Sequence, residues 1–284
     1  MKTRSATIVT DAVKSQWNAA AEGWDAHASA LEPWLASSTA TMISMAGIRA
    51  GSHVLDVAAG GGQQAVAIAA HVGREGRIIC TDLSPALVGR LQANAQRLGL
   101  TMIEARVADA QEEVGETDAF DSAVCRLGLM LMPQPERCLR SVRDALRKGG
   151  RFSALVFAGP EDNPCIRILM KTALEHAGQP PRDPFTPGGL LSLGRPGHLE
   201  ALFRAEGFGE VSTFRIDAPF RLPSVDAYVD FIRDAAAPVR AILQPLDPAR
   251  REDAWRDIRN QLAGFDRGGE WAGPNTLLLA TGRK

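Results

Sequence analysis

Short apolar runs alternate with segments of helical period along the middle of the chain. A short apolar run bounded by turn residues predicts a strand, whereas apolar residues that recur every three or four positions predict a helix. By these criteria we expect strands at 54–57, 78–81, 102–107, 120–125 and 151–157, and helices at 63–70, 85–98 and 134–147. This alternation predicts an α/β fold with a doubly wound, mostly parallel sheet and right-handed crossovers.

Helical segments flank the alternating region on its N-terminal side. Residues 10–47 predict helices that Pro33 interrupts. Their shared apolar face carries Trp17, Trp24, Leu31 and Trp34. Helical spacing of these side chains is typical of core packing.

The pattern changes after residue 157, where closely spaced Pro and Gly residues leave one clear helix at 165–177. A helix at 198–206 and a strand at 210–217 resume the sheet, a helical insertion covers 224–263, and a last strand covers 276–282, which makes seven strands. We therefore expect an N-terminal helical lid segment at 1–50, a cofactor-binding core at 51–158, a lid insertion at 159–197, a core helix and strand at 198–223, a helical lid insertion at 224–270, and the last core strand at 271–284.

The first strand of the core runs directly into a glycine loop. Its sequence from residue 54 is VLDVAAGGG, with Gly60 to Gly62 at the end and a helix after them. Glycines let a ligand approach the backbone closely, and the amide groups at a helix N-terminus attract negative charge. The loop also satisfies the dinucleotide pattern G-x-G-x-x-A, so it indicates an adenosine-bearing ligand without identifying it.

Three successive strands carry an acid at or near their carboxyl ends: Asp56, Asp82 and Asp109. Asp82 follows the glycines by about twenty residues, where a doubly wound sheet places an acid on a ribose. A single Asp at a strand end is usually a surface carboxylate or a helix cap. Three in succession beside a glycine loop favour a binding edge. A dehydrogenase does not need an acid at the position of Asp56, whereas an adenosyl ligand that carries an amino group could be bound by this carboxylate.

These residues resemble the class I S-adenosylmethionine-dependent methyltransferases, and within them the branch of the ubiquinone and menaquinone biosynthesis methyltransferases. The resemblance runs from about residue 17 to residue 157. It is strongest in four segments: VLDVAAGGG from residue 54, TDLSP from residue 81, Phe120-Asp121, and LRKGGRF from residue 146.

The resemblance implies a Rossmann-like methyltransferase fold, in which the last strand is antiparallel and inserted beside the fifth. It also implies that S-adenosylmethionine is the methyl donor and S-adenosylhomocysteine the product. The matched positions would contact the cofactor: Trp17, Trp24, Asp56, Ala58, Gly60, Gly62, Asp82, Leu83, Asp109, Ala110 and Arg126. Among these, Asp82 would bind the ribose hydroxyls, Asp109 would accept from the adenine amino group, and the segment holding Trp17 and Trp24 would close over the cofactor.

Three positions depart from the family pattern. Ala58 stands where the family usually has Gly, which is acceptable if its φ is negative. Gly61 stands where this branch often has Thr, so a hydroxyl that could anchor the carboxylate of the methionine is missing. Lys148 replaces a common Pro and changes only a turn.

Composition indicates which kinds of partner and which cellular location to expect. The chain has 284 residues, enough for a sizeable core, and a formal net charge of -1. It therefore lacks the basic field that nucleic-acid binding requires. The scattered cysteines (Cys80, Cys125, Cys138 and Cys165) indicate neither a metal site nor a disulfide framework. No apolar stretch is long enough for a membrane span, so we expect a cytoplasmic protein that binds a small-molecule acceptor and could form a homodimer.

Two apolar stripes suggest the character of the acceptor. They comprise Ile166, Leu169, Met170, Ala173 and Leu174 in one insertion, and Tyr228, Phe231, Ile232, Val239, Ile242 and Leu243 in the other. Such stripes usually pack on each other. As a set they also predict an acceptor pocket with apolar walls, suited to aromatic or prenylated substrates.

The expected reaction is in-line displacement, in which a nucleophilic atom of the acceptor attacks the methyl group and S-adenosylhomocysteine departs. Alignment and exclusion of water would then be the main contributions of the protein, and no metal is needed. His27 or His176 could face the acceptor, whereas His53 and His71 suit surface or structural roles. No residue is assigned as a catalytic base.

Two other functions fit parts of this pattern. A protein of the same fold could bind the cofactor without methylating. A nicotinamide-dependent oxidoreductase could use the same glycine loop, but the single tyrosine, Tyr228, has no lysine four residues later.

Overall fold

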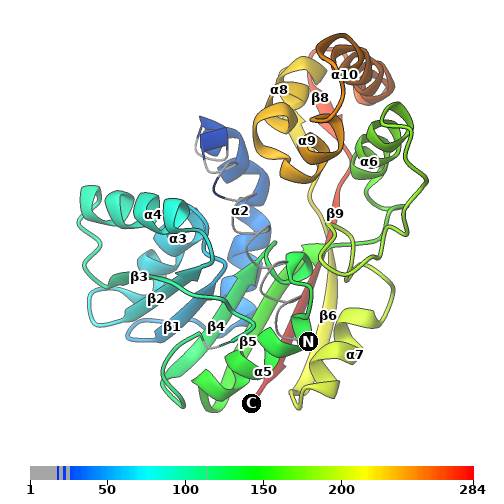
Figure 1. The fold of residues 1–284 in the computed structure, drawn as a ribbon. Helices are drawn as coiled ribbons and strands as arrows, with labels where there is room; N and C mark the ends of the chain where they lie inside the picture. Colours follow the sequence, from blue (N-terminus) through cyan, green and yellow to red (C-terminus); the bar gives the residue numbers. More distant parts are fainter. Residues whose placement is uncertain (1–17, 19–21, 24–25, 113) are drawn as a thin grey trace. The chain divides into compact units, whose positions relative to one another are not determined.

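The computed structural model describes residues 18, 22–23, 26–112 and 114–284, and it divides the chain into two compact units (Figure 1). The sheet unit comprises Leu35–Gly159, Pro184–Ile216 and Thr276–Lys284. The helical unit comprises the described residues up to Trp34, together with Pro160–Asp183 and Asp217–Asn275. Each unit therefore assembles from segments that are far apart in the sequence.

The sheet unit is built on a seven-stranded sheet with the strand order β3-β2-β1-β4-β5-β9-β6. The strands are β1 (His53–Val57), β2 (Arg77–Asp82), β3 (Ile103–Val107), β4 (Phe120–Arg126), β5 (Leu146–Phe157), β6 (Gly209–Asp217) and β9 (Thr276–Arg283). The first five strands pair in parallel, and β9 pairs antiparallel with β5. The expected mostly parallel, seven-stranded sheet, with an antiparallel last strand beside the fifth, is confirmed.

Helices follow the strands as the alternating pattern predicts. They are α3 (Gln63–Val72), α4 (Pro85–Arg97), α5 (Pro135–Ala145) and α7 (His198–Ala205). Ser84 caps α4 because its Oγ accepts from the amide of Leu87 at 3.2 Å, and Pro85 occupies the first turn. The apolar side chains of the central strands, such as Leu55 and Ile79, are fully buried. This burial explains why the sequence of these strands is largely apolar.

Helix α2 (Ala28–Met45) contains Pro33 without ending there, so the expected interruption at Pro33 is wrong. A proline in a helix leaves the carbonyl four residues earlier without its amide donor. That carbonyl belongs to Ser29, an exposed residue, where water can replace the donor. The helix ends within the sheet unit, where the hydroxyl of Ser122 donates to the Ala46 carbonyl at 2.7 Å.

The helical unit contains α6 (Pro164–His176), α8 (Val225–Ala235), α9 (Ala237–Leu243), α10 (Pro248–Leu262) and a short two-stranded antiparallel sheet of β7 (Phe220–Leu222) and β8 (Trp271–Gly273). This small sheet was not expected, and residues 271–273 pair with β7 rather than forming the start of the last core strand. Its strands are too short for a periodic signal. Trp271 is fully buried, stacks on Tyr228 with ring centroids 4.3 Å apart, and donates its Nε1–H to the Leu262 carbonyl.

The two apolar stripes of the helical unit pack into a common core. Their buried members in that core are Leu169, Ala173, Leu174, Tyr228, Phe231, Ile232, Val239, Ile242 and Leu243, with Met170 partly buried against it. Mutual packing, the usual role of such stripes, is thus the role that the structure shows for these side chains.

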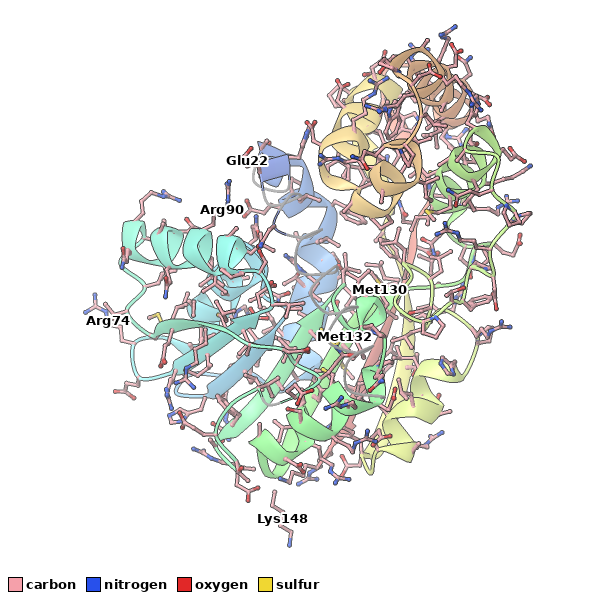
Figure 2. The ribbon with its side chains drawn as sticks, in the orientation of Figure 1. Glu22, Arg74, Arg90, Met130, Met132 and Lys148 are labelled. Atoms are coloured by element: carbon pink, nitrogen blue, oxygen red, sulfur yellow. The ribbon has the colours of Figure 1, made fainter. Side chains whose placement is uncertain are left out.

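The segment 184–197, which we expected to be part of a lid insertion, packs within the sheet unit. The hydroxyl of Ser192 donates to the carbonyl of Met130 at 2.6 Å. Met130, labelled in Figure 2, lies on the short 3₁₀ helix η1 (Leu129–Leu131) that follows β4. A side chain at Gly194 would lie 2.6 Å from the carbonyl oxygen of Ala158, so glycine is needed for this close approach. Among the described residues, no helix has both the length and the apolar character needed to cross a bilayer.

Candidate cofactor-binding site

The glycine loop joins β1 to α3 with three residues in the left-handed region, two of which are glycines. Gly60 has φ 58° and Gly62, the N-cap of α3, has φ 93°. A Cβ on Gly62 would lie 2.8 Å from Cγ of Leu91, whereas a Cβ on Gly60 would meet nothing within 4 Å. Gly62 is therefore needed for packing on α4, while Gly60 leaves open space beside the loop.

Asp82, the last residue of β2, is bonded directly to this loop. The amide of Gly60 donates to its Oδ2 at 3.0 Å, and the amide of Ser84 donates to its Oδ1 at 2.9 Å. Burial raises the pKa of Asp82, and these backbone bonds oppose the rise. Each carboxylate oxygen has a second lone pair, so the half-buried group can still accept from two further donors.

Asp56 lies one residue before the end of β1 and is completely buried. The side-chain amide of Gln64, in the first turn of α3, donates from Nε2 to Asp56 Oδ1. Burial raises the pKa of Asp56 to about 7, although the Gln64 hydrogen bond and the charge of Arg126 lower it. A carboxyl group that would be fully ionised in water thus titrates near neutrality here.

Arg126 ends β4, the strand that pairs with β1 on the side opposite β2. Its Nη1 donates to the hydroxyl of Thr39 on α2 at 2.8 Å. Burial lowers its pKa to about 10, and the charge of Asp56 opposes that change. Arg126 is therefore a cation at neutral pH that acts on Asp56 through its charge. The next residue, Leu127, has φ 57°, a strained value for leucine.

Asp109 follows β3 at the same carboxyl edge. The amide and side-chain nitrogen of Gln111 both donate to its Oδ1, at 2.9 and 3.3 Å. The amide of Ala108 donates to the carbonyl of Asp82 at 3.0 Å, which ties the end of β3 to the end of β2. Ala110 is buried beside Asp109.

The structure therefore brings most of the expected site residues to one edge of the sheet. Gly60 and Asp82 are joined by a hydrogen bond, and Asp56, Arg126 and Asp109 end or follow the neighbouring strands. Leu83 is half-buried directly after Asp82. Trp17 and Trp24 lie outside the described residues, so their expected contact with the cofactor stays a prediction.

Sequence reasoning missed Gln64 and Thr39. Gln64 sits two residues after the glycine loop, and its burial beside Asp56 gave no signal in the sequence. Thr39 gave no signal, because its contact with Arg126 spans 87 residues of sequence.

Ala58 adopts φ 54°, so the condition under which alanine is acceptable at this position, a negative φ, is not met. Left-handed backbone is unfavourable for alanine because its Cβ approaches the following carbonyl. Strain of this kind concentrates at functional sites, and Ala58 lies in the loop between β1 and α3.

The histidines considered as possible bases have partners within the helical unit. His27 Nε2 lies 2.9 Å from an oxygen of Asp234, and His176 Nε2 lies 3.2 Å from an oxygen of Asp257. In the sheet unit, His71 Nδ1 lies 2.9 Å from the carbonyl of Ala67 on its own helix. These contacts give each ring a local structural role.

Comparison with known proteins identifies the fold and a methyltransferase domain within the chain. Residues 48–177 match the family model described as a methyltransferase domain. An uncharacterized protein of Mycobacterium tuberculosis is 34% identical over 132 residues, and the match covers 45% of this chain and 46% of the relative. The ubiquinone/menaquinone biosynthesis C-methyltransferase of a Marinomonas strain is 33% identical, with 42% of this chain and 48% of that protein covered. These matches span about half the length of each relative.

A longer match links the chain to the nocamycin O-methyltransferase of Saccharothrix syringae. The two are 25% identical over 246 residues, which cover 83% of this chain and 86% of the relative. This match extends beyond the region of the family model into both insertions.

Solved structures show the same fold at low sequence identity. A putative methyltransferase from Bacillus halodurans has a TM-score of 0.57 at 17% identity, with 87% of this chain and 99% of that chain covered. The [4+2]-cyclase SpnF has a TM-score of 0.55 at 21% identity, with 87% and 80% covered. The strand order and the glycine loop with its acids agree with the match of residues 48–177 to a methyltransferase domain, and the chain is similar to the class I S-adenosylmethionine-dependent methyltransferases.

Proposed function

We propose that this protein transfers a methyl group from S-adenosylmethionine to a small acceptor of apolar or aromatic character, by in-line displacement. In the proposed complex, Gly60 and Gly62 give the cofactor access to the backbone, Asp82 accepts from the ribose hydroxyls, and Asp109 and Ala110 contact the adenine. S-adenosylmethionine supplies a methyl group already activated on a sulfonium. The protein aligns the reactants and excludes water.

The observation that carries this proposal is the hydrogen bond from the Gly60 amide to Asp82 Oδ2. This bond holds Asp82 beside Gly60. Of Gly60 and Gly62, only Gly60 has open space where a Cβ would lie. A nucleoside could therefore lie against the loop backbone while its ribose hydroxyls donate to Asp82. Charge-assisted bonds of that kind contribute roughly 1.5 to 3 kcal/mol each.

The proposed acceptor class is supported by the relatives. Two of them are named for methyl transfer to nocamycin and for a step of ubiquinone and menaquinone biosynthesis. The match to the nocamycin enzyme covers 83% of this chain, so it extends beyond the cofactor-binding core.

Calorimetric titration with S-adenosylhomocysteine tests the proposal. We expect micromolar or tighter binding to the wild type and a loss of at least a hundredfold in Asp82→Ala, since two charge-assisted bonds are removed. Asp144→Ala, at an exposed position on α5, is the matched control and should bind as the wild type does. Absence of heat with the wild type would refute the proposal.

The alternative of a cofactor-binding protein with other chemistry has one supporting observation, because the same fold occurs in a [4+2]-cyclase. Turnover separates the two functions. A methyltransferase converts S-adenosylmethionine to S-adenosylhomocysteine in the presence of phenolic or enolic acceptors, whereas a non-methylating protein binds both ligands and leaves the donor intact.

The oxidoreductase alternative loses support in the sheet. Dinucleotide-binding folds have the strand order 3-2-1-4-5-6. Here an antiparallel β9 lies between β5 and β6.

A further inference from the structure

The side chain of Gln64 is buried with only half of its amide satisfied. Its exposed fraction is 1%, its Nε2 donates to Asp56 Oδ1, and its Oε1 has no hydrogen-bond partner among the described residues. An unsatisfied buried acceptor destabilises a protein by about 1 to 3 kcal/mol. A donor that appears only in another state of the site would explain why this oxygen is kept there.

The groups around Asp56 limit which atom could donate to Gln64 Oε1. They are Gln64 from α3, Cys80 and Asp82 from β2, and Cys125 and Arg126 from β4. The thiol of Cys80 lies 4.0 Å from Asp56 Oδ2, and burial raises the pKa of both thiols, so they remain neutral. Asp82 adds a repelling charge, and Arg126 adds an attracting one while it is bonded to Thr39.

Rotation of the Gln64 amide exchanges its nitrogen and oxygen in front of Asp56. With nitrogen facing the acid, as in the structure, the amide donates to an ionised carboxylate. With oxygen facing the acid, it accepts the proton of a neutral carboxyl group. One side chain can thus satisfy Asp56 in both protonation states, which an ammonium group could not do because it only donates.

We propose that Gln64 is a positioning residue that makes cofactor binding proton-coupled: its amide can hold Asp56 either as a neutral acid or as a carboxylate in the free protein, and an ammonium-bearing ligand in the glycine loop selects the carboxylate. This inference rests on the proposed function. On binding, the O–H bond of the Asp56 carboxyl breaks, its proton passes to the solvent, and the ammonium group keeps its own protons. The Gln64 amide then donates its N–H to the new carboxylate.

Burial sets the pH range of this coupling. Because Asp56 has a pKa of about 7 in the free protein, it is mostly neutral at pH 6 and mostly ionised at pH 8.5. A ligand cation nearby stabilises the ionised form. Binding should therefore release about 0.9 proton at pH 6 and almost none at pH 8.5, and affinity should rise about tenfold from pH 6 to pH 8.

Two probes separate Asp56 from Asp82. S-adenosylhomocysteine carries the ammonium group, whereas 5′-methylthioadenosine has the same adenosine and thioether without the amino acid. Asp82 also has a raised pKa, and any proton that it releases appears with both probes. Titration calorimetry in two buffers of different ionisation enthalpy, at pH 6, 7 and 8.5, gives the proton count for each. We expect proton release with S-adenosylhomocysteine to exceed that with methylthioadenosine by nearly one proton at pH 6.

Glutamine variants test the role of the amide. Gln64→Leu removes a bond that lowers the pKa of Asp56, so proton release should shift to higher pH, and the loss of affinity at pH 7 should be largely recovered at pH 9. Gln96→Leu, at an exposed position on α4, is the control and should behave as the wild type. Asp56→Asn should abolish the additional proton release.

The outcomes are distinct. Equal affinity for S-adenosylhomocysteine at pH 6 and 8.5 without proton exchange would overturn this inference and leave the proposed function standing. A Gln64→Leu variant that loses the same factor of affinity at every pH, with an unchanged proton count, would reduce Gln64 to a structural residue and overturn it as well. Failure of the wild type to bind S-adenosylhomocysteine at any pH would overturn the proposed function itself.

Discussion

A Cβ on Gly128 would lie 2.4 Å from the Cβ of Ala58, so the absence of a side chain at Gly128 makes room for the methyl group of Ala58. The two residues belong to the segments that follow β1 and β4, which are adjacent in the sheet. Ala58 has φ 54°, whereas Gly128 has φ -103°, which any residue adopts. Glycine is thus needed at 128 for space, and alanine at 58 is strained by its backbone.

This relationship predicts energetic coupling between the two positions. Ala58→Gly should stabilise the protein by about 0.5 to 1 kcal/mol, because left-handed strain is relieved. Gly128→Ala should destabilise it by about 2 to 3 kcal/mol through overpacking. In the double variant the clash with Ala58 is gone, so urea unfolding should show an interaction energy of about 1 to 2 kcal/mol. Additive effects of the two substitutions would contradict the proposed contact.

The same pair of residues shows what the sequence could predict. The position of Ala58 in the loop follows from the apolar run and the glycines after it. Its φ does not, because the hydrogen bond from Ala59 to Thr81 and the space at Gly128 together fix the loop, and both come from other strands. The contact between Gln64 and Asp56 is of the same kind, since burial of both groups arises only when α3 packs on the sheet.

Gly60 and Gly62 should respond differently to alanine. Both have positive φ, so each substitution introduces backbone strain of about 1 kcal/mol. Gly62→Ala adds a clash with Leu91 and should destabilise the protein by about 2 to 4 kcal/mol. Gly60→Ala meets open space, so it should retain most of the stability and lose S-adenosylhomocysteine binding at least tenfold.

Thermal unfolding and calorimetric titration of both variants make this comparison. The result that counts against the placement of the cofactor is a stable Gly60→Ala variant that binds S-adenosylhomocysteine with wild-type affinity.

The alternation of strands and helices was predictable because β1, β2 and β5 contain short apolar runs between turns, although β3 is less apolar. The helical unit was predictable only in part. Its helices have clear apolar stripes, whereas β7 and β8 have three residues each and are separated by 48 residues of sequence. Within the sheet unit, the segment 184–197 makes the contact between Ser192 and Met130, which no periodicity encodes.

Pro33 offers a way to stabilise the protein outside the site. Replacement by alanine should restore an amide donor for the carbonyl of Ser29 and raise the free energy of unfolding by about 1 to 2 kcal/mol, after allowance for the greater entropy of the unfolded chain. Pro33 is exposed, so no packing is lost. Glu32→Ala, at the exposed preceding position, is the control and should change stability by less than about 0.5 kcal/mol. A less stable Pro33→Ala variant in urea unfolding would show that the proline is required.

Asp56 should make the unliganded protein less stable as the pH rises. Its pKa is about 7 when folded and near 3.8 when exposed, so between these values the folded state binds more protons than the unfolded state. Stability therefore falls with pH across this window and levels off above about pH 7.

Asp56→Asn removes the titrating group. Its stability relative to the wild type should rise between pH 4 and pH 8 by up to about 4 kcal/mol, the value of a shift of about three pKa units. Urea unfolding at both pH values measures this difference, and Asp144→Asn, on an exposed surface, should show none. If the wild type and Asp56→Asn follow parallel pH profiles, Asp56 is ionised throughout the range, and burial does not control its charge.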